Sequence, residues 1–149
     1  MRATRTFALV FGIISIVVGI LGLVPAFSTA PPSGAPHVAL SAGYRYLLGQ
    51  FPVNFASDVI YILIGVIGVA CGSNFLAARL YARSLFLIFG FVTVLGFMPA
   101  TDVLGGLAPI FGSDTWLNAA AAVVAGIFGY IVSEPDVSPA EIEHAHALG

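Results

Sequence analysis

The sequence predicts an all-α membrane protein, a bundle of four transmembrane helices built from two parallel helical-hairpin repeats. Three observations predict this fold class. Hydrophobic residues make up 59% of the 149 positions and charged residues only 8%, against roughly 25% charged residues in a soluble domain. Four stretches without charge approach the ~20 residues that cross a bilayer as a helix. A short motif recurs at the ends of the first and third stretches.

The composition also excludes several classes of function. The mean hydropathy of +1.04 leaves too few charges to cover the surface of a soluble domain, which excludes a soluble enzyme, a nucleic-acid-binding protein and a disordered tail. Cys71 is the single cysteine, so neither an internal disulfide nor a cysteine zinc site can form. The net charge of −2 is too small to indicate a polyanionic partner.

The first predicted span covers residues 7–24, after Arg2 and Arg5 and before Pro25. Its backbone must satisfy its own hydrogen bonds in hydrocarbon, which requires a helix. A signal peptide with a cleavage site at 28–30 is the alternative. The apolar run is longer than the ~7–15 residues usual for such a peptide, so we expect an uncleaved span.

Three further charge-poor stretches follow, each close to the ~17-residue lower limit for a span. We therefore expect a four-span domain at 1–133 with outer loops at 25–56 and 99–114, and a short cytoplasmic tail at 134–149. With their flanking interfacial residues, the later spans are 57–76, 80–98 and 115–132.

Arginines predict the orientation of the spans. Arg2 and Arg5 precede the first span, and Arg79 and Arg83 lie between the charge-free runs 59–76 and 84–98 of the second and third spans, whereas only Arg45 lies in an outer loop. Because positive residues concentrate on the cytoplasmic side, both termini are expected in the cytoplasm. The predicted location is the cell membrane, as a multi-pass protein.

An internal repeat relates the two halves. Residues 21–26 (LGLVPA) match 95–100 (LGFMPA), and in each the proline ends a helix. Ser-Asp at 57–58 and at 113–114 begins each even-numbered span. A unit of two spans gives both copies the same orientation, so the repeats are parallel.

Glycines spaced at helical intervals predict close packing between the spans. Small residues allow helix backbones to approach in lipid, where no hydrophobic force drives association. The segment 68–72 is the best candidate for a tight crossing. The predicted packing residues are Gly19, Gly22, Gly65, Gly68, Gly72, Gly126 and Gly129.

Two aspartates lie at the starts of the even-numbered spans. Asp58 and Asp114 can cap free backbone N–H groups there, which is the favoured interpretation. The alternative is a functional carboxylate on an ion or proton pathway, because an acidic group deep in the membrane is costly. Arg45 lies in the loop that leads to Asp58 and could pair with it.

The first outer loop divides into two parts. Prolines make 28–36 extended. The aromatic residues of 40–51 predict a short interfacial helix or a re-entrant cap, which favours a membrane anchor over a binding lid.

The histidines do not predict a metal or cofactor site. His37 lies in the loop, and His144 and His146 lie in the tail, where Ser138 and Pro139 predict the start of a short helix. His144 and His146 are two apart and point to different faces of such a helix, so no shared metal is expected. No phosphate-binding loop or nucleophile–histidine pair is present in the spans, so no enzyme and no cofactor are expected.

The proline-ended motifs and Phe51-Pro52-Val53-Asn54 resemble a family of small bacterial four-span membrane proteins catalogued as a domain of unknown function. In that family, Phe-Pro-x-Asn is followed by His-Asn-x-x-His at the second span, and Asp-Asn-x-x-His begins the fourth. Here every histidine of the pattern is replaced, so the resemblance implies the architecture and no histidine chemistry. The residues at these positions are Ser57, Asp58 and Tyr61, then Asp114, Thr115 and Asn118.

These observations predict a non-enzymatic structural or accessory subunit in the bilayer. Its expected partners are membrane lipids and either other membrane proteins or further copies of itself, without nucleic acid. The alternative is a small transporter or channel with Asp58 and Asp114 at its outer mouth.

Overall fold

The chain is mostly helical, as predicted. The computed structural model describes residues 3–101 and 103–132, so the predicted tail lies outside the described residues. Four α-helices occur in this part of the chain, and a π-helical turn, η3 (Ile127–Ile131), continues the last of them. The helices are α1 (Ala3–Leu23), α2 (Phe55–Cys71), α3 (Phe75–Gly96) and α4 (Ser113–Gly126).

The turn between α2 and α3 has the expected length but lies five residues earlier in the chain than expected. The predicted spans end at 76 and begin again at 80, whereas α2 ends at Cys71 and α3 begins at Phe75. The cause is Asn74, whose side-chain Oδ1 accepts hydrogen bonds from Leu76 N at 2.8 Å and Ala77 N at 3.2 Å. This N-cap starts α3 one turn before Arg79, so both arginines of the segment lie inside the helix.

Three helical segments in the described residues are long and apolar enough to cross a membrane: Ala3–Leu23, Phe75–Gly96 and Ser113–Ile131. The 17-residue helix α2 is a shorter apolar helix. Many large apolar side chains on the surface of these helices are exposed, for example Ile14 at 54%, Leu87 at 61% and Val123 at 62%. The helices are therefore compatible with a membrane protein.

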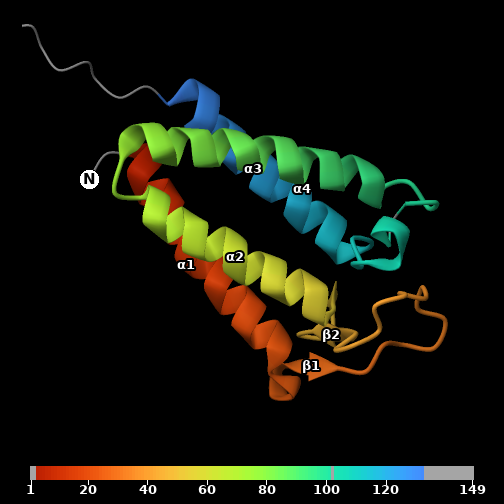
Figure 1. Ribbon diagram of the computed structural model, residues 1–149. Helices are drawn as coiled ribbons and strands as arrows, with labels where there is room; N and C mark the ends of the chain where they lie inside the picture. The colour runs from red at the N-terminus through yellow and green to blue at the C-terminus, as the bar shows by residue number, and fades with distance from the viewer. Residues whose placement is uncertain (1–2, 102, 133–149) are drawn as a thin grey trace, which may run out of the picture.

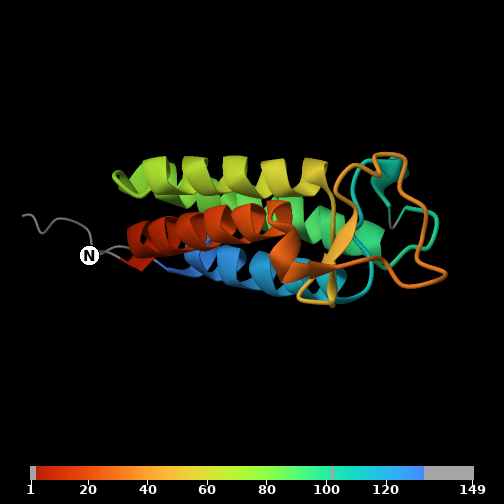
Figure 2. The same ribbon diagram turned by 90° about the horizontal axis from the view of Figure 1, so that it is seen from below.

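The helices form two pairs, α1 with α2 and α3 with α4 (Figure 1). The pairs lie close together where α1 begins and diverge toward the strands, and seen from below all four helices follow one common direction (Figures 1 and 2). Where the pairs meet, large side chains fill the core between small ones. The buried cluster comprises Phe7, Ala8, Ala78, Tyr81, Ala82, Leu85, Phe89, Ala122 and Ala125.

Glycines bring α1 and α2 into backbone contact. A Cβ placed on Gly12 would lie 2.7 Å from Gly65 O, and one placed on Gly65 would lie 2.5 Å from Gly12 O. A Cβ on Gly19 would lie 2.5 Å from Asp58 O. Side chains at these positions would push the helices apart, because ordinary contact begins at about 3.4 Å.

The other glycines named from the sequence face different neighbours. Gly68 lies against the hydroxyl of Tyr81 on α3, so it leaves room for a side chain of the second helix pair. Gly72 lies beside Leu9. On the α3–α4 side, a Cβ atom placed on Gly126 would lie 2.8 Å from Phe86. A Cβ atom placed on Gly129 would lie 3.0 Å from Arg83.

Arginine side chains gather at one end of the helices, here called the arginine end. Arg5 Nε donates to Gly72 O at 3.0 Å, and Arg79 and Arg83 donate to Gly129 O at 3.2 and 2.9 Å. Each cation thus meets the carbonyls at the C-terminal end of a helix, where positive charge is favoured.

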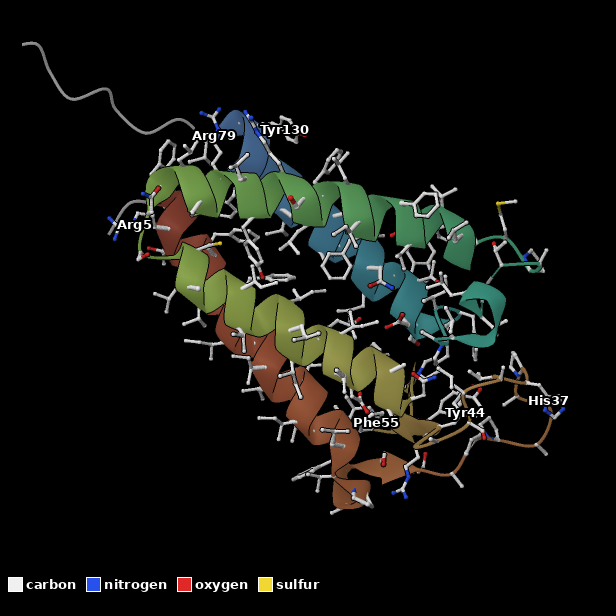
Figure 3. All side chains as sticks on the ribbon, in the orientation of Figure 1. Arg5, His37, Tyr44, Phe55, Arg79 and Tyr130 are labelled. Carbon is white, nitrogen blue, oxygen red and sulfur yellow. The ribbon has the colours of Figure 1, made fainter. Side chains whose placement is uncertain are left out.

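The opposite end, here called the strand end, carries His37, Tyr44 and Phe55, whereas Arg5, Arg79 and Tyr130 lie at the arginine end (Figure 3). Burial, together with the neighbouring Tyr46, raises the pKa of Tyr44 at the strand end, so its phenol stays neutral.

The interfacial helix predicted at 40–51 is wrong: residues 45–53 form a β-hairpin instead. Strands β1 (Ser28–Thr29), β2 (Arg45–Leu47) and β3 (Phe51–Val53) form an antiparallel sheet in the order β1-β2-β3. The reason is the turn at Leu48 and Gly49, where φ is +52° and +72° and Gln50 N donates to Leu47 O. Two consecutive positive φ values are typical of a hairpin turn and exclude a helix.

Candidate functional site

Asn54 caps α2 and joins it to both outer segments. Its side chain accepts from Ser57 N at 2.9 Å, and its own N donates to Ser57 Oγ at 2.9 Å, which forms a capping box. Its Nδ2 also donates to Leu40 O at 3.0 Å and to Leu107 O at 2.8 Å. Asn54 is completely buried, so it fixes the start of α2 beneath the two outer segments.

A polar centre lies between the two helix pairs, formed by Tyr61 on α2 and Asp114 and Asn118 on α4. Asn118 Nδ2 donates to Asp114 Oδ2 at 2.8 Å. The Tyr61 hydroxyl lies 3.4 Å from Asp114 Oδ1 and 3.5 Å from Asn118 Oδ1. Asp114 and Asn118 are only 5% and 2% exposed. The polar centre therefore connects the pairs through side chains that are otherwise surrounded by apolar groups.

Two cavities adjoin the polar centre. The larger, of about 190 Å³, lies between α2, α3, α4 and the segment 104–110, and we call it the central cavity. The smaller, of about 80 Å³, lies toward α1 and includes Ser15. Tyr61, Asn118 and Phe89 border both cavities. The polar centre thus separates two hollows in the interior.

Asp58 lies apart from the polar centre. It is 1% exposed, its carboxylate rests against the backbone at Gly22 of α1, and its Oδ1 has no hydrogen-bond partner among the described residues. Asp58 and Arg45 border a separate cavity of about 160 Å³, but no ion pair joins them within the described part of the chain. The two predicted aspartates are therefore not brought together.

The capping role expected for the aspartates is also not what the structure shows. Both lie in the first turns of their helices, but Asn54 caps α2, and Gly112 precedes α4 without a side-chain cap. Asp114 instead bonds to side chains of the polar centre. The neighbouring Thr115 donates from Oγ1 to Ile110 O at 2.7 Å and lies against Gly96.

Sequence reasoning did not identify the polar centre. In the sequence pattern, Tyr61 and Asn118 stand only as replacements of family histidines, and Asn54 only as part of the Phe-Pro-x-Asn motif. The usable indication was that Tyr61 and Asn118 hold the same place in their motifs. Tyr61 lies one turn after Ser57, and Asn118 lies one turn after Asp114. Within 3–101 and 103–132, no group of three or more His, Cys, Asp or Glu side chains could hold a metal ion.

Comparison with known proteins gives one family. The family model described as "Domain of unknown function (DUF4383)" matches residues 5–131. No curated protein and no solved structure gives a significant match.

Proposed function

The chain belongs to the family described as Domain of unknown function (DUF4383), and from that premise we propose that it is a four-span protein of the cell membrane with a non-enzymatic accessory role. The three long apolar segments support three of the crossings. Helix α2 has 17 residues and a length of roughly 26 Å, a few ångströms less than the ~30 Å hydrocarbon core. Local thinning of the bilayer accommodates such a mismatch at modest cost.

The arginine end is the cytoplasmic end in this proposal. Arg5, Arg79 and Arg83 lie there and Arg45 lies on β2, at the strand end, so the positive residues divide three to one among the described arginines. Positive residues are retained on the cytoplasmic side. Because α1 begins and η3 ends at the arginine end, both ends of the helical region face the cytoplasm.

Equivalent contacts in the two pairs support a duplicated hairpin. Arg5 donates to Gly72 O in the first pair, as Arg79 donates to Gly129 O in the second. The separation in sequence between Arg5 and Arg79 relates positions of α1 to positions of α3. The separation between Gly72 and Gly129 relates positions of α2 to positions of α4. The same separations relate further positions: Thr4 to Ala78, Phe7 to Tyr81, Ala8 to Ala82, Gly22 to Gly96, Asp58 to Thr115, Gly65 to Ala122 and Gly68 to Ala125.

The polar centre lies at the axis of this repeat. Tyr61 and Asn118 are equivalent positions under the duplication, and they contact each other at 3.5 Å. Equivalent residues of two parallel repeats can touch only close to the axis that relates them. The polar centre therefore holds the two hairpins in register.

The outward surface of α1 and α4 supports an accessory role. A shallow hollow of about 570 Å³ lies between these helices, bordered by Val10, Ile14, Val124 and Phe128. In lipid, association depends on such shape complementarity between helices. This hollow is the observation that carries the proposal, because an added helix from another subunit or a second copy would fill it.

Isolation in mild detergent tests the accessory role. The protein should elute as a defined oligomer or with a stoichiometric partner, and Ile14→Trp should reduce the assembled fraction. Leu87→Trp, at a 61% exposed position on α3, is the matched control and should not. A monomer, or equal effects of the two variants, contradicts the proposal.

A small transporter is the second candidate. The observation in its favour is Asp114, a buried carboxylate beside the central cavity. Solute flux into proteoliposomes that is lost in Asp114→Asn and retained in Asp58→Asn would favour transport over the accessory role. Asp58, which lies against α1, takes no part in this version of the pathway.

A further inference from the structure

The central cavity combines an apolar lining with a single acidic group. Isoleucine, valine, phenylalanine, alanine and proline side chains provide most of its wall, and the polar centre lies at one side. Ser57 also borders it, but its hydroxyl donates to Asn54 O at 2.9 Å and is thereby occupied. The groups that remain to face a ligand are the phenol of Tyr61, the carboxylate of Asp114 and the amide of Asn118.

The carboxylate has hydrogen bonds but no positive partner in the described chain. Asn118 and Tyr61 contact its two oxygens, and both are neutral groups. Among the described arginines, three donate to carbonyls at the arginine end and Arg45 lies on β2, and none borders the central cavity. A carboxylate in apolar surroundings is costly without a countercharge, so the cavity favours a positively charged occupant.

Aromatic rings supply a second attraction for a cation. Tyr61 and Phe89 both border the cavity, from α2 and α3. The face of an aromatic ring attracts an ammonium group within about 6 Å, most strongly where water is excluded. An anionic occupant would meet the Asp114 carboxylate, and a neutral one would gain neither interaction.

Volume and access define the rest of the ligand. The cavity volume of about 190 Å³ equals roughly six water molecules at liquid density, enough for a compact head such as trimethylammonium. Ile60 and Ile88 border the cavity and are 50% and 49% exposed, so it opens sideways between α2 and α3. An alkyl chain could leave along this opening into lipid.

We propose that the central cavity binds the ammonium head of a lipophilic cation, with Asp114 as its countercharge, Tyr61 and Phe89 as its aromatic contacts, and the alkyl tail between α2 and α3. The inference rests on the proposed membrane location for the path of the tail and is independent of the accessory role. A lipid headgroup and a free amphiphilic amine both supply an ammonium group of this chemistry.

Binding of tritiated decyltrimethylammonium to the purified full chain in dodecylmaltoside micelles tests the proposal. Scintillation proximity should give saturable binding, weakened at least about tenfold by Asp114→Asn, which corresponds to the loss of one ionic contact. Asp58→Asn removes an equally buried aspartate outside the cavity and should change binding less than twofold. Unlabelled decyl sulfate and decanol, with the same tail, should compete poorly.

Two further arms complete the experiment. Displacement by dodecylphosphocholine assigns the site to a lipid headgroup, and displacement by simple alkylammonium ions alone assigns it to a free amine. Ile88→Trp should fill the cavity and abolish binding while α3 remains folded, and it decides the question if Asp114→Asn does not fold. Wild-type affinity in either folded variant, or equal competition by decyl sulfate, overturns the proposal. Because the assay reads the cavity in micelles, its result is independent of whether the chain assembles with a partner.

Discussion

Gly65→Ala is expected to separate α1 from α2. The added Cβ would lie 2.5 Å from Gly12 O and 2.7 Å from Ile16 N, and both are backbone atoms that cannot rotate away. Ordinary contact begins at 3.4 Å, so the backbones must move apart by about 0.9 Å at this point. Overpacking of this kind costs about 1–3 kcal/mol, which exceeds the 0.5–1 kcal/mol that alanine gains over glycine in a helix. The difference between the midpoints of these two ranges gives a net loss of stability of about 1 kcal/mol.

Gly90→Ala is the matched control. A Cβ at Gly90, within α3, meets nothing within 4 Å, so only the gain in helix propensity remains. Unfolding in mixed detergent–dodecylsulfate micelles, followed by circular dichroism, should show Gly65→Ala less stable than wild type and Gly90→Ala equal or more stable. Equal stability of the two variants would refute the inferred backbone contact.

Two further predictions concern the ends of the helices. Asn54→Ala should cost about 2–4 kcal/mol in the same unfolding assay, because it removes a cap and leaves two loop carbonyls unpaired; a loss below 1 kcal/mol would contradict this. Arg5→Gln should cost about 1 kcal/mol, whereas Arg79→Gln should cost less, because Arg83 donates to the same carbonyl of Gly129. Additive losses in the Arg79 and Arg83 double variant would contradict this shared role.

The helical content could be predicted from the sequence because each helix lies largely in a charge-free run. The helix boundaries could be predicted less well, because the charge-free runs end before Arg79 and resume only after Arg83. Arg79 and Arg83 lie inside α3, where their side chains reach Gly129 O at the end of η3. A charged side chain is thus accommodated by a contact with another helix, which no local pattern reveals.

The outer sheet could not be predicted because its turn depends on a residue that rarely adopts a positive φ. Leu48 has no preference for that conformation, and the aromatic residues around it suit an interfacial helix equally well. The pairing of β1 with β2 supplies the contacts that override this preference.

The polar centre could be predicted only in part. Tyr61 and Asn118 are polar residues within apolar segments, but the sequence alone does not bring α2 next to α4. Under the proposed duplication, equivalent positions of two parallel repeats meet at their common axis, and this is the information that would bring Tyr61 and Asn118 together. The sequence pairs Asp58 with Asp114, but the two aspartates do not make equivalent contacts. Asp58 lies against Gly22 as Thr115 lies against Gly96, so Asp58 corresponds to Thr115.

The crossing of α2 tests the central claim most directly, because α2 is shorter than the three long apolar segments and joins the two ends of the molecule. Single cysteines in a Cys71→Ser background would be placed at His37, Ser73 and Ala100, which are all exposed. In intact cells, a membrane-impermeant maleimide should label the cysteines at 37 and 100, and should label the one at 73 only after the membrane is opened. Labelling of 37 and 73 from the same side would contradict the four-span account.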